Sequence, residues 1–375
     1  MAVRWRSRRM LFGALLGMGA LTFGPVPAAE AAHRPARSAA TALPIGPVEA
    51  VPTMQSGLPS GASGVAVLGT LGSDLYLFGS QSETTGNIAG VWRYRAGVWT
   101  KIGETSARVG YGIGADYNRL APYGAVEYQG NLYVGDRRIG NLYRLVLNPD
   151  GSFRDVVVAA KVGNEDVLPG PVWRGRLALG TFGAYGTGEN AGVYAYDGTT
   201  VTKLLDLTGL GNAGFVTSMV VYGNDLWVTG INAAASLSQV WRIDPSLRAT
   251  LMHSGPVDYR LVTHGRDLYA VRTTFAFPYE THAIVRWSGN RFVTVSGEIG
   301  LFLAIGSLGG ISLGGTILDL CYYNGIYALH GTALQPVVPG MPTMGAPMSV
   351  KLHQGYLWIA SNQPVGLYRA AVTSS

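Results

Sequence analysis

The chain has 375 residues, of which 47% are hydrophobic and only 13% charged, and this composition excludes both a disordered chain and a highly charged helical one. Its 53 glycines and 20 tyrosines favour many short strands joined by tight turns. The formal net charge is +6, and the single cysteine excludes an intramolecular disulfide.

Residues 1–31 are predicted to be an export signal peptide. Arg4, Arg6, Arg8 and Arg9 precede an apolar stretch, 10–23, and small residues surround a predicted cleavage point before Ala32. Residues 7–12 resemble the twin-arginine export signal, and an ordinary secretory signal that contains paired arginines is the alternative. Either route predicts a secreted, periplasmic or cell-envelope protein of bacterial type. No later apolar run is long enough to cross a bilayer.

Loss of this leader, which carries four arginines and Glu30, would lower the formal charge from +6 to +3. So small a charge argues against a nucleic-acid partner, which usually needs a concentrated basic surface. Residues 32–41, rich in Ala, Arg and Ser, are predicted to be a flexible tether. Residues 42–375 are predicted to form the single folded domain.

A repeat runs through that domain seven times. Each unit has a strand that begins with an aliphatic residue and usually contains an aromatic or ends in glycine, at 75–79, 132–135, 177–180, 226–230, 268–271, 311–314 and 357–360. The first residues of these strands are 57, 45, 49, 42, 43 and 46 positions apart, which is typical of four-stranded propeller blades. The predicted fold is therefore all-β, a seven-bladed β-propeller of four-stranded antiparallel blades.

The remaining strands of each blade follow at regular offsets. In the first unit they are 91–94 and 98–102, comparable pairs follow in the next two units, and the fourth and fifth units each have a third strand followed by a turn. The segment Leu75 to Gly79, followed by Trp92, Tyr94 and Trp99, resembles a kelch repeat. The resemblance covers nearly the whole domain as architecture, but most units lack the glycine doublet of that family, so it implies a kelch-like propeller and no subfamily.

The order of the strands is ambiguous in the sequence at two places in the ring. In the sixth unit, residues 323–326 could join a first strand to a second or a third to a fourth, and the regular period favours the latter. The seventh unit ends at 365–372 without a fourth strand, so an N-terminal strand within 42–51 is expected to close the ring. Pro44 and Pro47 suit an outer edge strand, because proline cannot donate a backbone hydrogen bond.

Ligands of propellers bind mainly on the face that carries the loops between second and third strands and between blades. Three insertions fall there, at 105–122, 182–192 and 273–283. Their aromatic, carboxylate and basic side chains suit a glycan, peptide or protein ligand, although the same aromatics could simply pack onto neighbouring blades. The candidate ligand-binding residues are Tyr111, Asp116, Arg119, Tyr185, Glu189, Phe277, Tyr279, Glu280 and His282.

Catalytic and metal-binding patterns are sparse. His282 beside Glu280 is the best acid–base candidate, with a solvated loop pair as the alternative. The histidines show no metal-ligand spacing, so neither a metal nor a cofactor is predicted. A copper-radical site of the kind that some kelch-like oxidases have would need a crosslinked Cys–Tyr pair and two histidines, and Cys321 is expected in an outer strand.

Besides a purely structural assembly unit, two functions remain open from the sequence. The first is an exported binding or scaffold protein, expected to be a monomer, that presents its loop face to a glycan, peptide or protein. The alternative is an exported enzyme, a lyase, glycoside hydrolase or oxidoreductase, with its site at the mouth of the central channel. Propeller active sites are assembled from residues far apart in the chain, so the absence of a motif does not exclude the enzyme.

Overall fold

The protein is described from a computed structural model, which defines residues 45–51, 65–80, 89–104, 124–135, 140–163, 166–183, 189–211, 213–232, 235–276, 279–302, 307–321, 324–338, 346–362 and 366–372. Residues Leu43–Ser375 form one compact unit. The expected leader and tether lie outside the described ranges. No helix among the described residues has both the length and the apolar character that crossing a bilayer requires.

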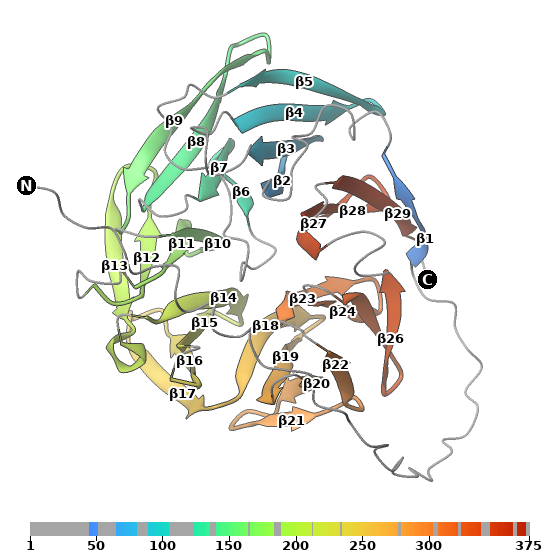
Figure 1. The fold of residues 1–375 in the computed structure, drawn as a ribbon. Coiled ribbons are helices and arrows are strands. Elements are labelled where there is room, and N and C mark those ends of the chain that lie inside the picture. The colour runs from blue at the N-terminus through green and yellow to red at the C-terminus, as the bar shows by residue number, and fades with distance from the viewer. Residues whose placement is uncertain are drawn as a thin grey trace, which may run out of the picture. The chain divides into compact units, whose positions relative to one another are not determined.

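The described strands form seven antiparallel sheets, six of four strands and one of four strands with a fifth at its side (Figure 1). Blade 1 consists of β2 (Val65–Leu71), β3 (Asp74–Ser80), β4 (Ala89–Arg95) and β5 (Val98–Glu104). Blade 2 consists of β6 (Ala125–Tyr128), β7 (Asn131–Gly135), β8 (Asn141–Leu147) and β9 (Phe153–Lys161). Blade 3 consists of β10 (Val167–Trp173), β11 (Arg176–Thr181), β12 (Gly192–Tyr196) and β13 (Val201–Asp206). Blades 4 and 5 are β14 (Phe215–Tyr222), β15 (Asp225–Asn232), β16 (Leu237–Ile243) and β17 (Ala249–Gly255); and β18 (Asp258–His264), β19 (Asp267–Ala276), β20 (Tyr279–Trp287) and β21 (Phe292–Thr294), with β22 (Ile299–Phe302) also paired to β20.

Blade 6 is β23 (Ser307–Leu313), β24 (Thr316–Cys321), β25 (Gly325–His330) and β26 (Ala333–Val338). Blade 7 is β27 (Ala346–His353), β28 (Tyr356–Asn362), β29 (Gly366–Val372) and β1 (Ile45–Ala50), which comes from the other end of the chain. A 3₁₀ turn, Thr208–Leu210, interrupts the connection from β13 to β14. The predicted all-β, seven-bladed propeller is thereby confirmed.

Burial explains why the second strands carry the clearest sequence signal. In β11 every residue after Arg176 is buried, and all six residues of β24 are buried, because both faces of these strands pack on neighbouring blades. The fourth strand β13 contains only partly buried and exposed residues, since one of its faces lies at the outside of the blade. Glycines at the ends of second strands permit close packing: a Cβ on Gly135 would lie 1.8 Å from the carbonyl oxygen of Val167 in the next blade.

The blades follow one another around a ring in chain order. The innermost strands β2, β6, β10, β14, β18 and β23 each contact the next one, blade 7 contacts blade 6 through β24 and β25, and β27 contacts β2. Blade 7 is completed by β1, which pairs with β29 in the order β1-β29-β28-β27. Closure by an N-terminal strand is therefore confirmed. Pro47 lies at a register shift in this outermost strand, and Pro44 lies outside the described residues.

The strand order of the sixth blade differs from the prediction. Residues 311–313 belong to the first strand, β23, and not to the second, so Gly314 and Gly315 form the first turn of the blade. Asn324 lies between the second strand, β24, and the third, β25, which begins at Gly325, so this segment joins neither of the two strand pairs that were expected. Cys321 therefore ends a buried second strand, and its expected place in an outer strand is wrong. The misassignment arose because first and second strands are both apolar, and apolar spacing does not distinguish them.

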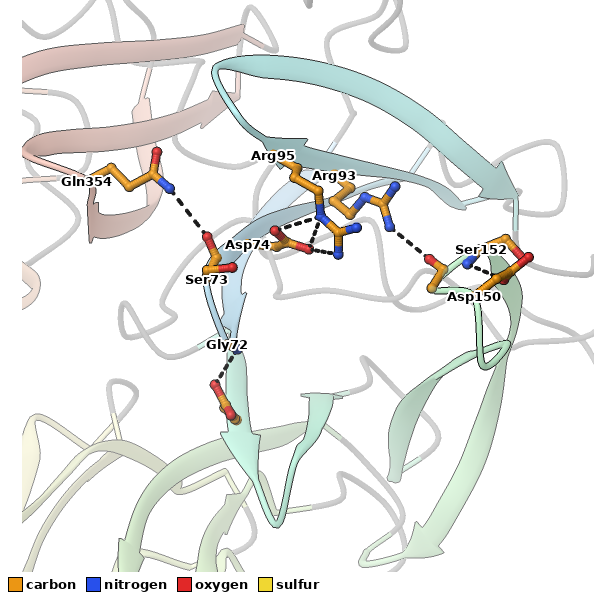
Figure 2. A network of polar contacts seen from close by, with 10 residues as sticks. Gly72, Ser73, Asp74, Arg93, Arg95, Asp150, Ser152 and Gln354 are labelled. Carbon is orange, nitrogen blue, oxygen red and sulfur yellow. Dashed lines mark hydrogen bonds and ion pairs between the residues drawn. The ribbon is translucent and has the colours of Figure 1, made fainter.

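Successive turns of a meander lie at opposite ends of the sheet, which gives the blades two distinct ends. We call the end with the first-to-second and third-to-fourth turns the turn face, and the end with the second-to-third and inter-blade connections the loop face. On the turn face, hydrogen bonds join turns of adjacent blades. Gln354 Nε2 donates to Ser73 O at 3.4 Å, Gly72 N donates to Glu127 Oε2 at 3.0 Å, and Arg93 Nη1 donates to Gly151 O at 2.8 Å (Figure 2).

The same pattern continues around the turn face. Tyr128 OH donates to Gly175 O, Trp173 Nε1 donates to Asn224 O, and His264 Nδ1 lies 2.9 Å from Ser312 Oγ. These contacts satisfy the polar groups of the turns and tie blade to blade. On the loop face, most connecting residues lie outside the described ranges.

Candidate functional site

Polar side chains are buried between blades 5 and 6, at the ends of the strands that lead to the loop face. Glu280 and His282 occupy the start of β20, and Asp319 and Cys321 occupy the end of β24. These two strand ends flank the second-to-third connections of their blades. The topology therefore brings together residues that are almost 40 positions apart in the chain.

The register of blade 5 places a row of polar residues on one face of the sheet. Asp258 pairs with Thr273, and Thr273 pairs with His282. Directly opposite residues of an antiparallel sheet point to the same side, and so do residues two apart on one strand. Asp258, Thr273, His282 and Glu280 thus share the face that packs on blade 6.

We call this group the blade 5–6 polar layer, and it consists of Asp258, Thr273, Glu280 and His282 from blade 5 with Asp319 and Cys321 from blade 6. Every member is buried, and Thr273, His282, Asp319 and Cys321 have no measurable exposure. Burying so many polar groups costs free energy unless each finds a partner. The layer is therefore a departure from the apolar packing of the core, and it needs a physical explanation.

His282 lies at the centre of the layer. Its Nδ1 is 2.7 Å from Asp319 Oδ2, and its Nε2 is 3.4 Å from Glu280 Oε2. The Cys321 thiol donates to Asp319 Oδ2 at 3.3 Å, and its Sγ lies 3.6 Å from His282 Nδ1. A carboxylate thus faces each nitrogen of the imidazole ring, and both carboxylates are buried.

The electrostatics follow from this arrangement. Burial is the largest influence and disfavours the charged imidazolium, but the Asp319 carboxylate and the contacts to Cys321 together outweigh it and raise the pKa of His282 well above its ordinary value. Burial raises the pKa of the Cys321 thiol to about 12, and the Asp319 charge acts in the same direction. The thiol is therefore not a nucleophile by itself, since the thiolate is the reactive form.

Asp258 and Thr273 have polar atoms that are left over. Arg260, itself buried, donates from Nε to Asp258 Oδ2 at 2.7 Å and from Nη1 to Thr217 O at 3.2 Å. Asp258 Oδ1 and Thr273 Oγ1 have no hydrogen-bond partner among the described residues. Buried polar atoms without partners are rare in proteins, and they often mark a place where a ligand, ion or water completes the structure.

The residues predicted from the sequence fall into two groups. Tyr111, Asp116, Arg119, Tyr185 and Phe277 lie outside the described residues. Glu189 is partly buried in blade 3, Tyr279 is 56% exposed at the start of β20, and Glu280 and His282 are buried in the polar layer. The pair is therefore not a solvated loop pair, because it belongs to a buried strand.

Asp258, Thr273, Asp319 and Cys321 were not among the sequence candidates. The signal that could have identified Asp319 is a carboxylate within the otherwise uncharged run 316–321, since a charged residue in a buried strand is rarely accidental. Cys321 was assigned to the wrong strand, so its contact with His282 could not be predicted.

Comparison with known proteins supports the fold. The sequence matches no family model and no curated protein. Among solved structures, the chain is similar to virginiamycin B lyase from Staphylococcus aureus, with a TM-score of 0.56 and 11% identity over 87% of this chain and 99% of that one. That structure is of a catalytically inactive histidine-to-alanine variant with quinupristin. A prolyl endopeptidase structure has a TM-score of 0.50 at 13% identity, covering 86% of this chain and 50% of that one. BamB from Moraxella catarrhalis has a TM-score of 0.45 at 12% identity, covering 84% and 99%.

At these identities the likeness establishes the β-propeller fold and nothing finer. The propeller class predicted from the repeat is confirmed, and the kelch-like pattern stays a resemblance. The two neighbours with TM-scores of 0.50 or more are a lyase and an endopeptidase. Function must therefore be argued from the residues of this chain.

Proposed function

We propose that this protein is an exported ligand-binding propeller, whose loop face receives a glycan, a peptide or a segment of a protein partner beside blades 5 and 6. The leader-like residues 1–31 support export. The observation that carries the binding site is the blade 5–6 polar layer, because two of its buried atoms, Asp258 Oδ1 and Thr273 Oγ1, have no partner among the described residues.

Position supports the same end of the propeller. The turn face uses its polar groups in contacts between blades, whereas the polar layer lies where the strands lead to the loop face. Exposed Tyr279 precedes buried Glu280 in β20, so an aromatic side chain lies at the same end of the strand, on the opposite face of the sheet from the carboxylate. An aromatic face beside oriented hydrogen-bonding groups is the usual chemistry of sugar and peptide recognition.

A thermal-shift screen of the purified protein against glycans and peptides tests this proposal. A ligand that binds only the folded state raises the melting temperature with concentration, by the equivalent of about 2.7 kcal/mol at a hundred times Kd. Thr273→Val removes the unpartnered hydroxyl with little change in shape, and we expect it to reduce the shift for the same ligand. His264→Gln on the turn face is the control and should leave the shift unchanged. Equal shifts in all three proteins would refute the proposed position.

An enzyme is the second candidate, and one observation favours it. Asp319 Oδ2 lies 2.7 Å from His282 Nδ1, and a carboxylate at one ring nitrogen orients an imidazole for acid–base chemistry at the other, here Nε2, beside Glu280 at 3.4 Å. The virginiamycin B lyase of the same fold is inactive when a histidine is replaced by alanine, and its structure includes quinupristin. Quinupristin is therefore the first substrate to test, with wild type and His282→Gln compared by mass spectrometry of the products. Equal product formation by both proteins would exclude His282 from the chemistry.

A further inference from the structure

The polar layer contains three side chains with the donor atoms of a metal site. His282 Nδ1, Asp319 Oδ2 and Cys321 Sγ all lie within 4.8 Å of one another, and all three residues are buried. The distances are 2.7 Å between Nδ1 and Oδ2, 3.3 Å between Sγ and Oδ2, and 3.6 Å between Sγ and Nδ1, which are hydrogen-bond distances. A small outward movement of the three side chains would let the same atoms bind one ion. They come from two different blades, so the site exists only in the folded ring.

The donor set narrows the choice of ion. One imidazole nitrogen, one thiolate and one carboxylate oxygen are the ligands that Zn²⁺ accepts in tetrahedral sites, whereas Ca²⁺ and Mg²⁺ take oxygen ligands. Three protein ligands leave the fourth position of a tetrahedron for water or another ligand, which is the pattern of zinc sites that act on a bound molecule.

Glu280 supplies a second feature of such sites. Histidines that bind metal through one nitrogen usually donate the other N–H to a carboxylate, which fixes the ring and its tautomer. Here Glu280 Oε2 lies 3.4 Å from Nε2, while Nδ1 faces Asp319 and Cys321. The two ring nitrogens are therefore already divided between an outer carboxylate and the candidate ligands.

Charge and unsatisfied polar atoms point the same way. With Arg260 paired to Asp258, the layer still contains the Glu280 and Asp319 carboxylates. A divalent ion would take the place of the proton shared by His282 Nδ1 and Asp319 Oδ2 and of the Cys321 thiol proton, so its two charges replace two protons. Thr273 Oγ1, fully buried in register with His282, has no partner among the described residues and would be available to a water on the ion.

We propose that His282, Asp319 and Cys321 form a site for a zinc-class divalent metal ion, with Glu280 as the outer carboxylate that orients His282. This site does not depend on the proposed glycan or peptide ligand. It differs from the sequence expectation of no metal, because the three ligands meet only across two blades.

Cobalt spectroscopy of the full-length protein tests the proposal. After treatment with a chelator, the protein is titrated with Co²⁺, whose thiolate complexes have a charge-transfer absorption in the near ultraviolet. Cys321 is the only cysteine of the chain, so any such band reports this residue. We expect a band that saturates at one ion per chain, does not depend on protein concentration, and disappears when Zn²⁺ is added. The absence of a thiolate band from the folded wild-type protein would overturn the proposal.

Variants assign the ligands. Cys321→Ser should abolish the band and weaken Zn²⁺ binding at least tenfold, and Glu280→Gln should keep the band but weaken binding by roughly 10- to 100-fold. His264→Gln, on the turn face, is the matched control and should bind as wild type. Unchanged Zn²⁺ affinity in Cys321→Ser would also refute the site. A ligand-induced thermal shift that persists in chelator-treated protein would separate the fate of the metal site from that of the proposed ligand site.

Discussion

His282 and Asp319 are joined by a 2.7 Å contact that crosses from the third strand of blade 5 to the second strand of blade 6. Neither side chain is exposed. The contact thus links two blades and also lies at the centre of the candidate site. The first role is tested by protein stability and the second by metal binding.

As a link, the pair should be strongly coupled in stability. Asp319→Asn leaves a buried imidazole without its charged partner, and breaking a buried pair in this way costs about 3–5 kcal/mol. We expect His282→Gln to cost a comparable amount and the double variant to cost less than the sum of the two. Chemical denaturation of the chelator-treated proteins gives the three free energies of unfolding. Additive losses would contradict direct coupling.

Two serines in equivalent positions of different blades make the same inter-blade bond. Ser218 Oγ in β14 accepts a hydrogen bond from Leu261 N at 2.9 Å, and Ser349 Oγ in β27 accepts one from Leu68 N at 3.0 Å. Both serines follow a register shift in the first strand of their blade. Each change to alanine would leave a buried N–H unpaired and should cost about 1–3 kcal/mol.

Because the two bonds lie in different parts of the ring and share no partner, the losses in Ser218→Ala and Ser349→Ala should add in the double variant to within about 0.5 kcal/mol. Denaturant titration measures all three. A loss below about 0.5 kcal/mol for either serine would show that the bond has no net role in stability.

Ring closure depends on β1. Val48 is partly buried against the core formed by blades 6 and 7, whereas neighbouring Glu49 is exposed and makes a 3.3 Å ion pair with Arg369. We expect Val48→Asp to lower the melting temperature and promote aggregation, because release of β1 would expose β29 as an edge strand. Glu49→Gln is the control, with a cost within about 1 kcal/mol, since surface ion pairs contribute little. Similar behaviour of the two variants would argue against closure as a source of stability.

Lys351 in the inner strand β27 predicts a pH dependence. Burial lowers the pKa of Lys351 from 10.5 to about 8, and it has no ion pair or hydrogen bond with the described residues. The folded state therefore disfavours the charged ammonium of Lys351. This charge lowers the free energy of unfolding at every pH below about 8. This penalty disappears as the pH rises from 8 to 10.5, where the unfolded chain alone retains the proton.

Lys351→Met should accordingly be more stable than wild type at pH 7, by at most about 3 kcal/mol, at about 1.4 kcal/mol per unit of pKa difference. The advantage should fall to nearly zero by pH 10.5. Melting temperatures of both proteins across this range provide the test. An advantage that is independent of pH would show that the gain comes from packing rather than from the charge.

The sequence predicted the ring well because a propeller repeats its signal. Leu75, Leu132 and Leu226 each begin a buried segment in the second strand of a blade, as the period indicated. The period could not separate Ile311 from Ile317, because both begin apolar runs followed by a change of direction. Ile311 lies in the first strand of blade 6 and Ile317 in the second.

The candidate site was harder to predict for a related reason. His282 and Glu280 were identified because they are close in the chain, whereas the residues that complete the layer come from two other strands of blade 5 and from blade 6. The contact of His282 with Asp319 depends on the register of β19 with β20 and on the packing of blade 5 against blade 6. Neither the register nor the packing can be predicted from a local sequence pattern, so the contact is seen only in the folded structure.

The most direct test of the account is a crystal structure of the protein grown with Zn²⁺, with anomalous diffraction recorded on both sides of the zinc absorption edge. If His282, Asp319 and Cys321 bind zinc, we expect one strong anomalous peak between His282 Nδ1, Asp319 Oδ2 and Cys321 Sγ, with Glu280 bonded to the opposite ring nitrogen. Zinc bound only elsewhere, with the His282–Asp319 hydrogen bond intact, would contradict it.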